Sequence, residues 1–259
     1  MHRHVVNSLA YYTFESLDDS GSTIHGISTR HGGVSPAPFH TLNLGRTVGD
    51  DPHHVATNLN RWHTALALDA SATVHAVQAQ ADGVAVVQSN HRGTRVSGVD
   101  ALLTVERGLP LMMRFADCVP ILLYDPRHHA IGVIHAGWRG TVLKVVTSAA
   151  QAMFASFDTR PRDLVAAIGP SIGPCCYRIG DDVAARVQTS FQDDADELLT
   201  SRNGAIHLDL WQANAKQLRA LGVNKIQVAE LCTADHTEDF YSARAENKTG
   251  RFGAIIALK

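Results

Sequence analysis

The sequence predicts a mixed α/β (α+β) fold, in which a layered, mixed β-sheet core is flanked by helices within a single domain. Strand-like runs alternate with amphipathic helices along the chain, which is typical of such mixed folds. Two strand-like runs, 109–124 and 130–135, are separated by a segment that opens with Asp125-Pro126, the usual residues of a turn. We therefore expect a β-hairpin, which excludes a purely parallel sheet.

The other elements follow in order from hydrophobic periodicity. Apolar residues recur at helical spacing from Pro52 to Leu68, and proline suits the first turn of a helix. A second helix is expected at 141–157 and a third at 208–221, which Gly222 would close. Short apolar runs predict further strands at 84–87, 164–168, 226–231 and 252–258.

Length and composition are those of an ordinary globular chain. At roughly 150 residues per domain, 259 residues make one large domain or two small ones, and no low-complexity linker divides them. We expect an N-terminal segment at 1–23 and a single domain at 24–259. A net charge of −2 argues against a protein that binds nucleic acid through a broad basic surface.

The apolar runs are too short to span a membrane, and the N-terminus lacks the apolar region of a signal peptide. We therefore expect a soluble, cytoplasmic protein with no membrane partner. In that compartment cysteines are normally reduced, so each cysteine either packs in the core or has a catalytic or metal-binding role. The four cysteines are Cys118, Cys175, Cys176 and Cys232.

The predicted hairpin places a thiol beside an imidazole. With Pro126-Arg127 as a two-residue turn, Cys118 lies directly opposite His135. Such a pair could bind zinc together with a third ligand, or act as a nucleophile with its base. It could also be a buried cysteine beside a hydrogen-bonded histidine. Asp117 adds a second polar group to an apolar strand, where burial without a partner would be costly.

A glycine-rich turn follows the pair. The segment 136–140 reads Ala-Gly-Trp-Arg-Gly and leads into the helix at 141–157. Backbone N–H groups at such a turn, together with Arg139, could receive an anion, although the glycines could equally serve only to make the turn tight.

These motifs resemble the laccase-domain or polyphenol oxidase family, whose members are also described as multifunctional purine nucleoside phosphorylases. The strongest match is Ala-Asp-Cys-Val-Pro at 116–120 followed by His-Ala-Gly-Trp-Arg-Gly at 135–140. Further matching segments occur in order at 28–35, 42–45, 100–102, 168–173, 175–177, 232–233 and 248–251. The resemblance therefore runs from about residue 24 to the end of the chain.

The resemblance implies a sheet core flanked by helices and a zinc site made from one cysteine and two histidines. It implies phosphorolysis of adenosine, inosine and methylthioadenosine, with adenosine deamination beside it. The partners are then a small-molecule nucleoside and phosphate, and the protein a monomer or homodimer. An older description of similar proteins is copper-dependent oxidation of phenols. A further role described for similar proteins is cytoplasmic amidase editing of peptidoglycan precursors.

The chain departs from the family at one metal ligand. The family's first metal histidine lies in a Gln-Val-His-Gly motif, and the matching position here is Gln80. An amide is a poor zinc ligand beside imidazole. His75 lies five residues earlier, so a regular strand would point it to the other face unless a bulge intervenes. By resemblance the metal ligands are Cys118 and His135, with Gln80 as a weak third ligand or water holder.

Four other residues are assigned by the same carry-over. Arg30 and Asn43 match motif residues expected in the same pocket, at phosphate or ribose, and we count them with Cys118 and His135 as catalytic candidates. Arg139 and Arg251 are candidates for anion contacts. The adjacent cysteines at 175 and 176 are expected in the core or the pocket wall.

The interpretation that follows is a zinc-dependent purine nucleoside phosphorylase with adenosine deaminase activity. One alternative is a copper-dependent polyphenol oxidase, although the only His-X-His motif is His2-Arg3-His4, far fewer than multicopper chemistry needs. A Cys/His amidase is a second alternative, with Cys118 as nucleophile and His135 as base. A degenerate relative that only binds a ligand is a third, suggested by Gln80.

Overall fold

The computed structural model describes residues 1–18 and 21–259, and within them the chain forms two large β-sheets and one small one. The seven-stranded sheet has the order β1-β2-β3-β16-β8-β4-β6 and the six-stranded sheet the order β15-β11-β9-β10-β7-β5. Strands β9 and β10 pair antiparallel while β11 and β15 pair parallel, so the predicted mixed class is confirmed.

The bounds of the strands in the seven-stranded sheet are β1 (His2–Val6), β2 (Leu9–Thr13), β3 (Thr23–Ser28), β16 (Phe252–Leu258), β8 (Leu111–Phe115), β4 (Val74–Val77) and β6 (Arg95–Ser97). Those of the six-stranded sheet are β15 (Lys225–Val228), β11 (Val165–Ile168), β9 (Val119–Asp125), β10 (Ala130–Ala136), β7 (Ala101–Thr104) and β5 (Val84–Val86). The small sheet contains β12 (Arg178–Ile179), β14 (Ala205–Leu208) and β13 (Leu199–Arg202). The hairpin β1–β2 pairs with β3, so the N-terminal segment extends the larger sheet.

The main helices are α2 (Pro52–Ala65), α4 (Val145–Phe157), α5 (Asp181–Phe191) and α7 (Leu210–Ala220). Short helices are α1 (Glu15–Asp18), α3 (Trp138–Val142), α6 (Ala195–Leu198) and α8 (Ala243–Glu246), and two 3₁₀ turns are η1 (Ser89–His91) and η2 (Gln192–Asp194). Helix α2 begins at Pro52 as expected, with Asp51 accepting a hydrogen bond from the backbone N–H of His53. No helix among the described residues is both long and apolar enough to cross a lipid bilayer.

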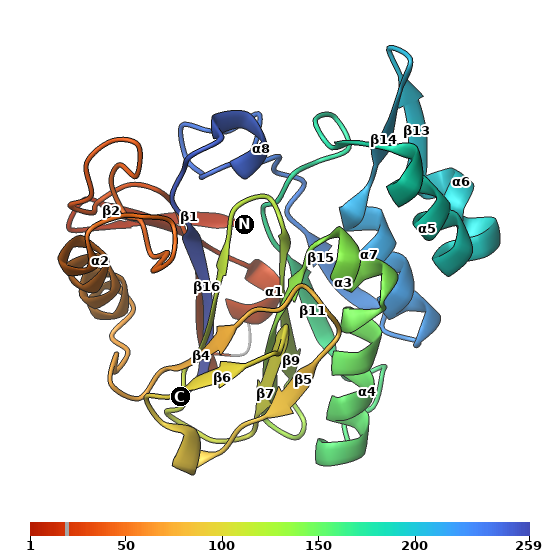
Figure 1. Cartoon of the computed structure of the whole chain (residues 1–259). Helices are drawn as coiled ribbons and strands as arrows, with labels where there is room; N and C mark the ends of the chain where they lie inside the picture. Colours follow the sequence, from red (N-terminus) through yellow and green to blue (C-terminus); the bar gives the residue numbers. More distant parts are fainter. Residues whose placement is uncertain (19–20) are drawn as a thin grey trace.

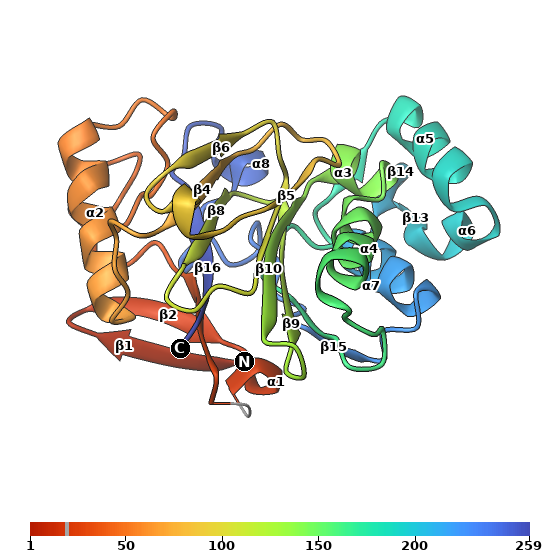
Figure 2. The ribbon, with the colours of Figure 1, turned by 90° about the horizontal axis from the view of Figure 1, so that it is seen from below.

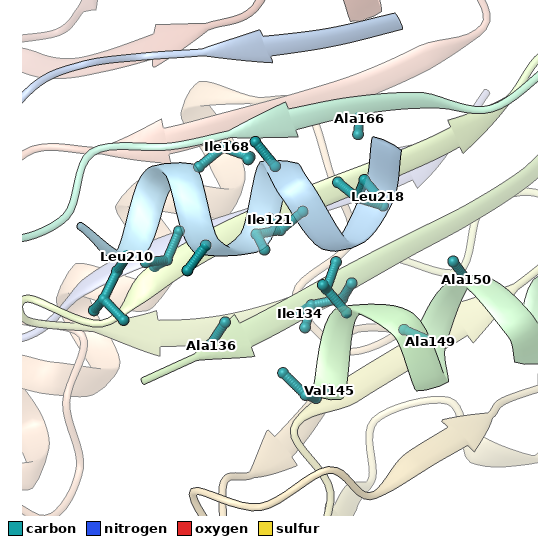
Figure 3. Packing of buried hydrophobic residues seen from close by; sticks show 14 of the residues in the cluster. Ile121, Ile134, Ala136, Val145, Ala149, Ala150, Ala166, Ile168, Leu210 and Leu218 are labelled. Atoms are coloured by element: carbon teal, nitrogen blue, oxygen red, sulfur yellow. The ribbon is translucent and has the colours of Figure 1, made fainter. Parts of the chain in front are cut away.

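The layers run from α2 through the two sheets to α4 and α7 (Figures 1 and 2). Alternate residues of β9 point to opposite faces. Ile121 packs against α4 and α7, whereas Leu122 packs against the other sheet. Figure 3 shows Ile121 and Ile134 between these two helices. Strand β9 is buried on both sides, which is why its sequence reads as a continuous apolar run.

The run at 109–124 is not one strand, as the sequence suggested, but two strands in different sheets. Strand β8 belongs to the seven-stranded sheet and β9 to the six-stranded one. The chain changes sheets at Asp117, which has a left-handed φ of 80°. Its carboxylate accepts hydrogen bonds from the Thr233 hydroxyl (2.7 Å) and the Arg244 backbone N–H (2.7 Å). These tertiary hydrogen bonds hold a conformation that an apolar pattern cannot reveal.

The hairpin β9–β10 is confirmed, but its register differs from the expected one by two residues. Asp125 pairs with Ala130, so the loop spans four residues, 126–129, instead of a two-residue turn. The Asp125 carboxylate accepts the backbone N–H of Arg127 (2.8 Å) and favours this wider loop. As a result His135 pairs with Pro120, and Cys118 comes level with Gly137.

The expected helix at 141–157 is divided into α3 and α4. It begins earlier, at Trp138, and is interrupted at Lys144, which has a left-handed φ of 67°. The helix expected at 208–221 begins two residues later at Leu210, where Asp209 caps it, and Gly222 follows its end with a φ of 88°.

We expect the buried His25 to make folding sensitive to acid. Burial lowers the pKa of His25 from 6.5 to about 4, and the nearby Asp18 opposes this only in part. Because the folded pKa is below the unfolded one, the stability is fully present above pH 6.5 and is lost as the pH falls towards 4. The loss from this residue would be roughly 3 kcal/mol.

Urea unfolding at several pH values between about 7 and about 4.5 would measure the effect, with the variant His25→Gln for comparison. The glutamine oxygen can still accept the Phe14 backbone N–H, which His25 Nε2 accepts at 2.8 Å. The variant should lose stability less steeply with acid. Equal slopes in the two proteins would contradict the assignment.

Candidate active site

A pocket of about 530 Å³ opens where the two sheets meet at the ends of β4, β8, β9 and β10. Strand β10 contributes His135, and the junction between β8 and β9 contributes Asp117 and Cys118. The loop after β4 contributes Gln80, and the segment before β16 contributes Arg251. The structure thus brings four residues predicted for the site around one pocket: Cys118, His135, Gln80 and Arg251.

Cys118 and His135 are neighbours, although they are not directly opposite each other in the hairpin. Gly137 lies between them, and a Cβ built on this glycine would be 2.9 Å from Cys118 Sγ and 3.9 Å from His135 Cε1. A glycine here is therefore required for the thiol to occupy its position beside the imidazole. The chain segment after the pair is a strand-to-helix turn, as expected, with Gly137 capping α3.

The buried carboxylate of Asp100 orients the imidazole. Asp100 Oδ1 accepts a hydrogen bond from His135 Nδ1 (2.8 Å), and the Asp100 carbonyl accepts the His135 backbone N–H (2.8 Å). The other carboxylate oxygen accepts the backbone N–H groups of Ala79 (3.0 Å) and Ala81 (2.9 Å). Asp100 therefore directs His135 Nε2 away from itself and also holds the loop that carries Gln80. Such an orienting carboxylate is common to both metal-ligating and catalytic histidines.

The same contacts set the charge of the pair. Burial by itself lowers the pKa of His135, but Cys118 and the hydrogen bond with Asp100 outweigh it and raise the pKa to about 9. Burial raises the pKa of Asp100, but hydrogen bonds from His135 and the backbone of Ala81 lower it below its usual value overall. These contacts therefore favour the protonated form of the His135 imidazole, which can donate a proton in the pocket.

Arginine side chains dominate the charge of the pocket. Among the described residues, those that line it are Arg46, Arg95, Arg114, Arg244 and Arg251, and none of them is in a salt bridge. Burial and the charges of Arg46 and Arg95 lower the pKa of Arg114 to about 10. Mutually repelling guanidinium groups around a pocket favour an anionic ligand.

Gln80, which the family resemblance matches to a metal-binding histidine, is not placed to act as a metal ligand. It lies in an exposed loop with a left-handed φ of 57°, and its side-chain oxygen accepts a hydrogen bond from Arg139 (3.2 Å). Arg139 thus reaches the edge of the pocket through Gln80 and also stacks on Trp138, 4.6 Å from the ring centroid. Cys118 and His135 remain as two strong donors, without a third thiolate, imidazole or free carboxylate beside them among the described residues.

His75 does not supply the missing ligand either. It lies in β4 with regular parallel pairing to Met112, so the bulge that would be needed is absent from this strand. Its side chain is buried next to Arg114, whose Nη2 lies 3.5 Å from His75 Nδ1. Burial, followed by the charge of Arg114, lowers the pKa of His75 to about 2. The imidazole is neutral and supports Arg114.

Arg30 and Asn43 lie outside the set of described residues that line the pocket. The buried Arg30 side chain donates to the carbonyl of His40 (3.1 Å) and to Glu246 (2.9 Å). Asn43 is fully buried, and its oxygen accepts the backbone N–H of Gly45 (2.8 Å) and of Arg251 (2.8 Å). Both side chains are therefore committed to loops that form the pocket wall.

The sequence interpretation missed two contributions. Asp100 was noticed only within a family motif, where a single acidic residue carries no sign that it will meet His135. Arg114 was noticed only as an interruption of an apolar run. A charged residue inside a buried strand is costly, and that cost is the signal that could have identified it.

Comparison with known proteins agrees with these observations. The protein named purine nucleoside phosphorylase from Bacteroides thetaiotaomicron is 35% identical over 256 residues, 95% of either chain. The purine nucleoside phosphorylase of Deinococcus radiodurans is 39% identical over 235 residues, covering 90% of this chain and 88% of that one. The crystal structure of YlmD from Geobacillus stearothermophilus matches with a TM-score of 0.92 at 33% identity, covering 99% of this chain and 98% of that chain.

A family model described as multi-copper polyphenol oxidoreductase laccase matches residues 24–259. That range includes the glycine-rich turn and the pocket residues described above, and it begins after β1 and β2. The resemblance inferred from the motifs is confirmed, and this chain belongs to that laccase-domain family.

Proposed function

We propose that this protein is a purine nucleoside phosphorylase whose chemistry takes place in the arginine-lined pocket beside Cys118 and His135. The observation that carries the proposal is the combination of a strongly cationic pocket with a histidine held by a buried carboxylate. Phosphorolysis needs both of these features, an anion site for phosphate and a group that can move a proton. The names of its relatives support the same activity.

The residues divide the work as follows. Arg46, Arg95 and Arg114 bind phosphate and place one of its oxygens against C1′ of the ribose. A bond forms between this oxygen and C1′ while the bond from C1′ to the purine nitrogen breaks, and the electron pair leaves with the purine. His135 gives a proton to the purine from Nε2 and regains one from the hydrogen phosphate. Asp100 keeps the imidazole in the required orientation.

Tyr177 and Ile172 supply an apolar wall of the same pocket, against which a purine ring would pack. Adenosine, inosine and methylthioadenosine are the substrates that the family resemblance suggests. The proposed ligands are therefore a nucleoside and inorganic phosphate.

Zinc would add water activation and hence adenosine deamination, and it would use Cys118 and His135 as ligands. The residues around the pocket do not complete such a site, because Gln80 accepts a hydrogen bond from Arg139 and the other charged groups of the lining are mainly guanidinium groups. Copper of the blue type would need a second histidine that the pocket lining, as described, does not offer. No step of the proposed reaction passes through a metal.

One further activity is favoured by a specific observation. Cys118, His135 and Asp100 have the order of a nucleophile, its base and an orienting carboxylate, which is the arrangement of a cysteine amidase. In that reaction the thiolate attacks a carbonyl carbon, the C–N bond breaks and the amine leaves with the proton held by His135. Water, activated by His135, then hydrolyses the thioester, which releases the acid and regenerates the thiol. The two activities predict different products.

The deciding experiment incubates the purified protein with inosine or adenosine, with and without phosphate. We expect equal amounts of free purine and ribose 1-phosphate, formed only when phosphate is present, because phosphate is the nucleophile. Free ribose as the sugar product would contradict phosphorolysis. Absence of turnover together with selective alkylation of Cys118 by iodoacetamide would favour the amidase.

Replacing Arg95 tests the phosphate site. Arg95 is exposed and lines the pocket, so Arg95→Met should fold normally. Loss of one charge-assisted hydrogen bond should raise KM for phosphate by about tenfold or more, with a smaller effect on KM for the nucleoside. Arg92→Met is the matched control, since Arg92 lies near in sequence but outside the pocket lining. An unchanged KM for phosphate in Arg95→Met would exclude Arg95 from the site.

Replacing Gly137 tests whether the thiol's position matters. The backbone of Gly137, with φ −74° and ψ 175°, accommodates alanine, but the new Cβ would meet Cys118 Sγ at 2.9 Å. Because the thiol lies beside the His135 imidazole that moves the proton, we expect Gly137→Ala to lower kcat for phosphorolysis by about tenfold or more with little change in melting temperature. Gly180→Ala is the control, because Gly180 also caps a helix in extended conformation but lies outside the pocket lining. Equal kcat values for the two variants would contradict this role.

A further inference from the structure

A second cluster of chemically active side chains lies behind the pocket, where two loops leave neighbouring strands. Strands β11 and β15 are parallel, so the loops that follow them emerge at the same edge of the sheet. The loops are joined by a bridge between Ser171 and Cys232 and by the hydrogen bond from Thr233 N to Ser171 O (3.1 Å). This pairing brings side chains about 60 residues apart in sequence to one place.

The cluster consists of three cysteines and one aspartate. The Sγ atoms of Cys175, Cys176 and Cys232 and a carboxylate oxygen of Asp235 all lie within 4.8 Å of one another. In a tetrahedral zinc site with Zn–S distances of about 2.3 Å, the ligand atoms lie roughly 3.8 Å apart. The four side chains would therefore need to move only slightly towards a common centre. All four cysteines of the chain are free thiols in this structure.

Hydrogen bonds already direct the thiols to the carboxylate. Cys175 Sγ donates to Asp235 Oδ2 (2.9 Å) and Cys176 Sγ donates to Asp235 Oδ1 (3.0 Å). The buried Cys232 Sγ accepts the backbone N–H of Gly173 (3.3 Å), a contact typical of metal-bound thiolates. The Cys175 and Cys176 thiols therefore already point to the carboxylate that would share the cation with them.

We propose that Cys175, Cys176, Cys232 and Asp235 form a structural zinc site separate from the pocket, and this assignment does not rest on the proposed phosphorylase activity. Three thiols and a carboxylate fill all four positions of a tetrahedron, so the site is closed in the manner of structural zinc. On binding, three Zn–S bonds and one Zn–O bond form and three thiol protons go to solvent, so that the site changes charge from −1 to −2. Thiolates select zinc over the hard cations magnesium and calcium.

The site would stabilise the rear wall of the pocket. The first loop carries Ile172 and leads to Tyr177, and both residues line the pocket. The second loop carries Thr233, whose hydroxyl holds the Asp117 carboxylate at the junction of β8 and β9. An ion that fixes the two loops to each other would therefore fix Tyr177 and Asp117 as well.

The test uses the full chain in a Cys118→Ala background, so that zinc at the pocket cannot contribute. We expect the metal-free Cys118→Ala protein to bind one equivalent of Zn²⁺ in a competition titration with a chromophoric chelator. Adding Asp235→Asn or Cys176→Ser should weaken this binding by about tenfold or more. Co²⁺ in place of Zn²⁺ should show thiolate charge-transfer absorption that Cys176→Ser diminishes.

Thermal unfolding gives a readout that does not depend on enzymatic activity. At the same concentration, Zn²⁺ should raise the melting temperature of Cys118→Ala more than that of Cys118→Ala/Asp235→Asn, whose exposed substitution preserves the shape of the side chain. Unchanged zinc affinity in both double variants would overturn the proposal. So would a purified protein that holds no metal and has lost two hydrogens in mass, because a disulfide would then occupy the cluster.

Discussion

The buried carboxylate of Asp100 is the interaction on which the site depends. One oxygen holds His135 Nδ1 and the other holds the backbone of the loop that carries Gln80. A buried charge is tolerated only where hydrogen bonds replace its water, and here they come from both walls of the pocket. The orientation of the imidazole, the position of the loop and the contact between Gln80 and Arg139 are thus consequences of a single residue placed before β7.

A second constraint acts where the chain passes from one sheet to the other. Asp117, in a left-handed conformation, separates β8 from β9 and receives hydrogen bonds from Thr233 and Arg244. The neighbouring residue Cys118 therefore faces the pocket instead of continuing a strand. The loop that holds Asp117 is also the one that contributes Cys232 and Asp235, so the thiol cluster and the pocket share a wall.

The positive charge of its arginines distinguishes this pocket from the zinc site of one cysteine and two histidines that the family resemblance implies. Gln80 stands where the family resemblance predicts a metal-binding histidine, which leaves Cys118 and His135 as two strong donors, and arginines supply positive charge around the pocket. Phosphate binding and transition-state stabilisation need positive charge in a fixed place, and guanidinium groups provide it without a metal ion. Bringing guanidinium groups together has an electrostatic cost. Burial and the neighbouring arginines lower the pKa of Arg114, and burial and the charge of Arg114 lower the pKa of His75, which stays neutral beside it.

The sequence by itself determined the fold class, the main helices α2, α4 and α7, the β9–β10 hairpin, the proximity of Cys118 to His135 and the family. It also predicted strands β5, β8, β11, β15 and β16, whereas helix α5, the N-terminal strands and the small sheet went unpredicted. The predicted features follow from local periodicity, turn residues and short motifs, which act over a few residues. Only the tertiary structure decided the hairpin register, the division of 109–124 between two sheets, and the places of Arg30 and Asn43 in the pocket's supporting loops. It also assembled the arginines and the thiol cluster. Their positions depend on pairing between strands distant in sequence, and a pattern along one strand reports which face is buried but not which side chains meet there.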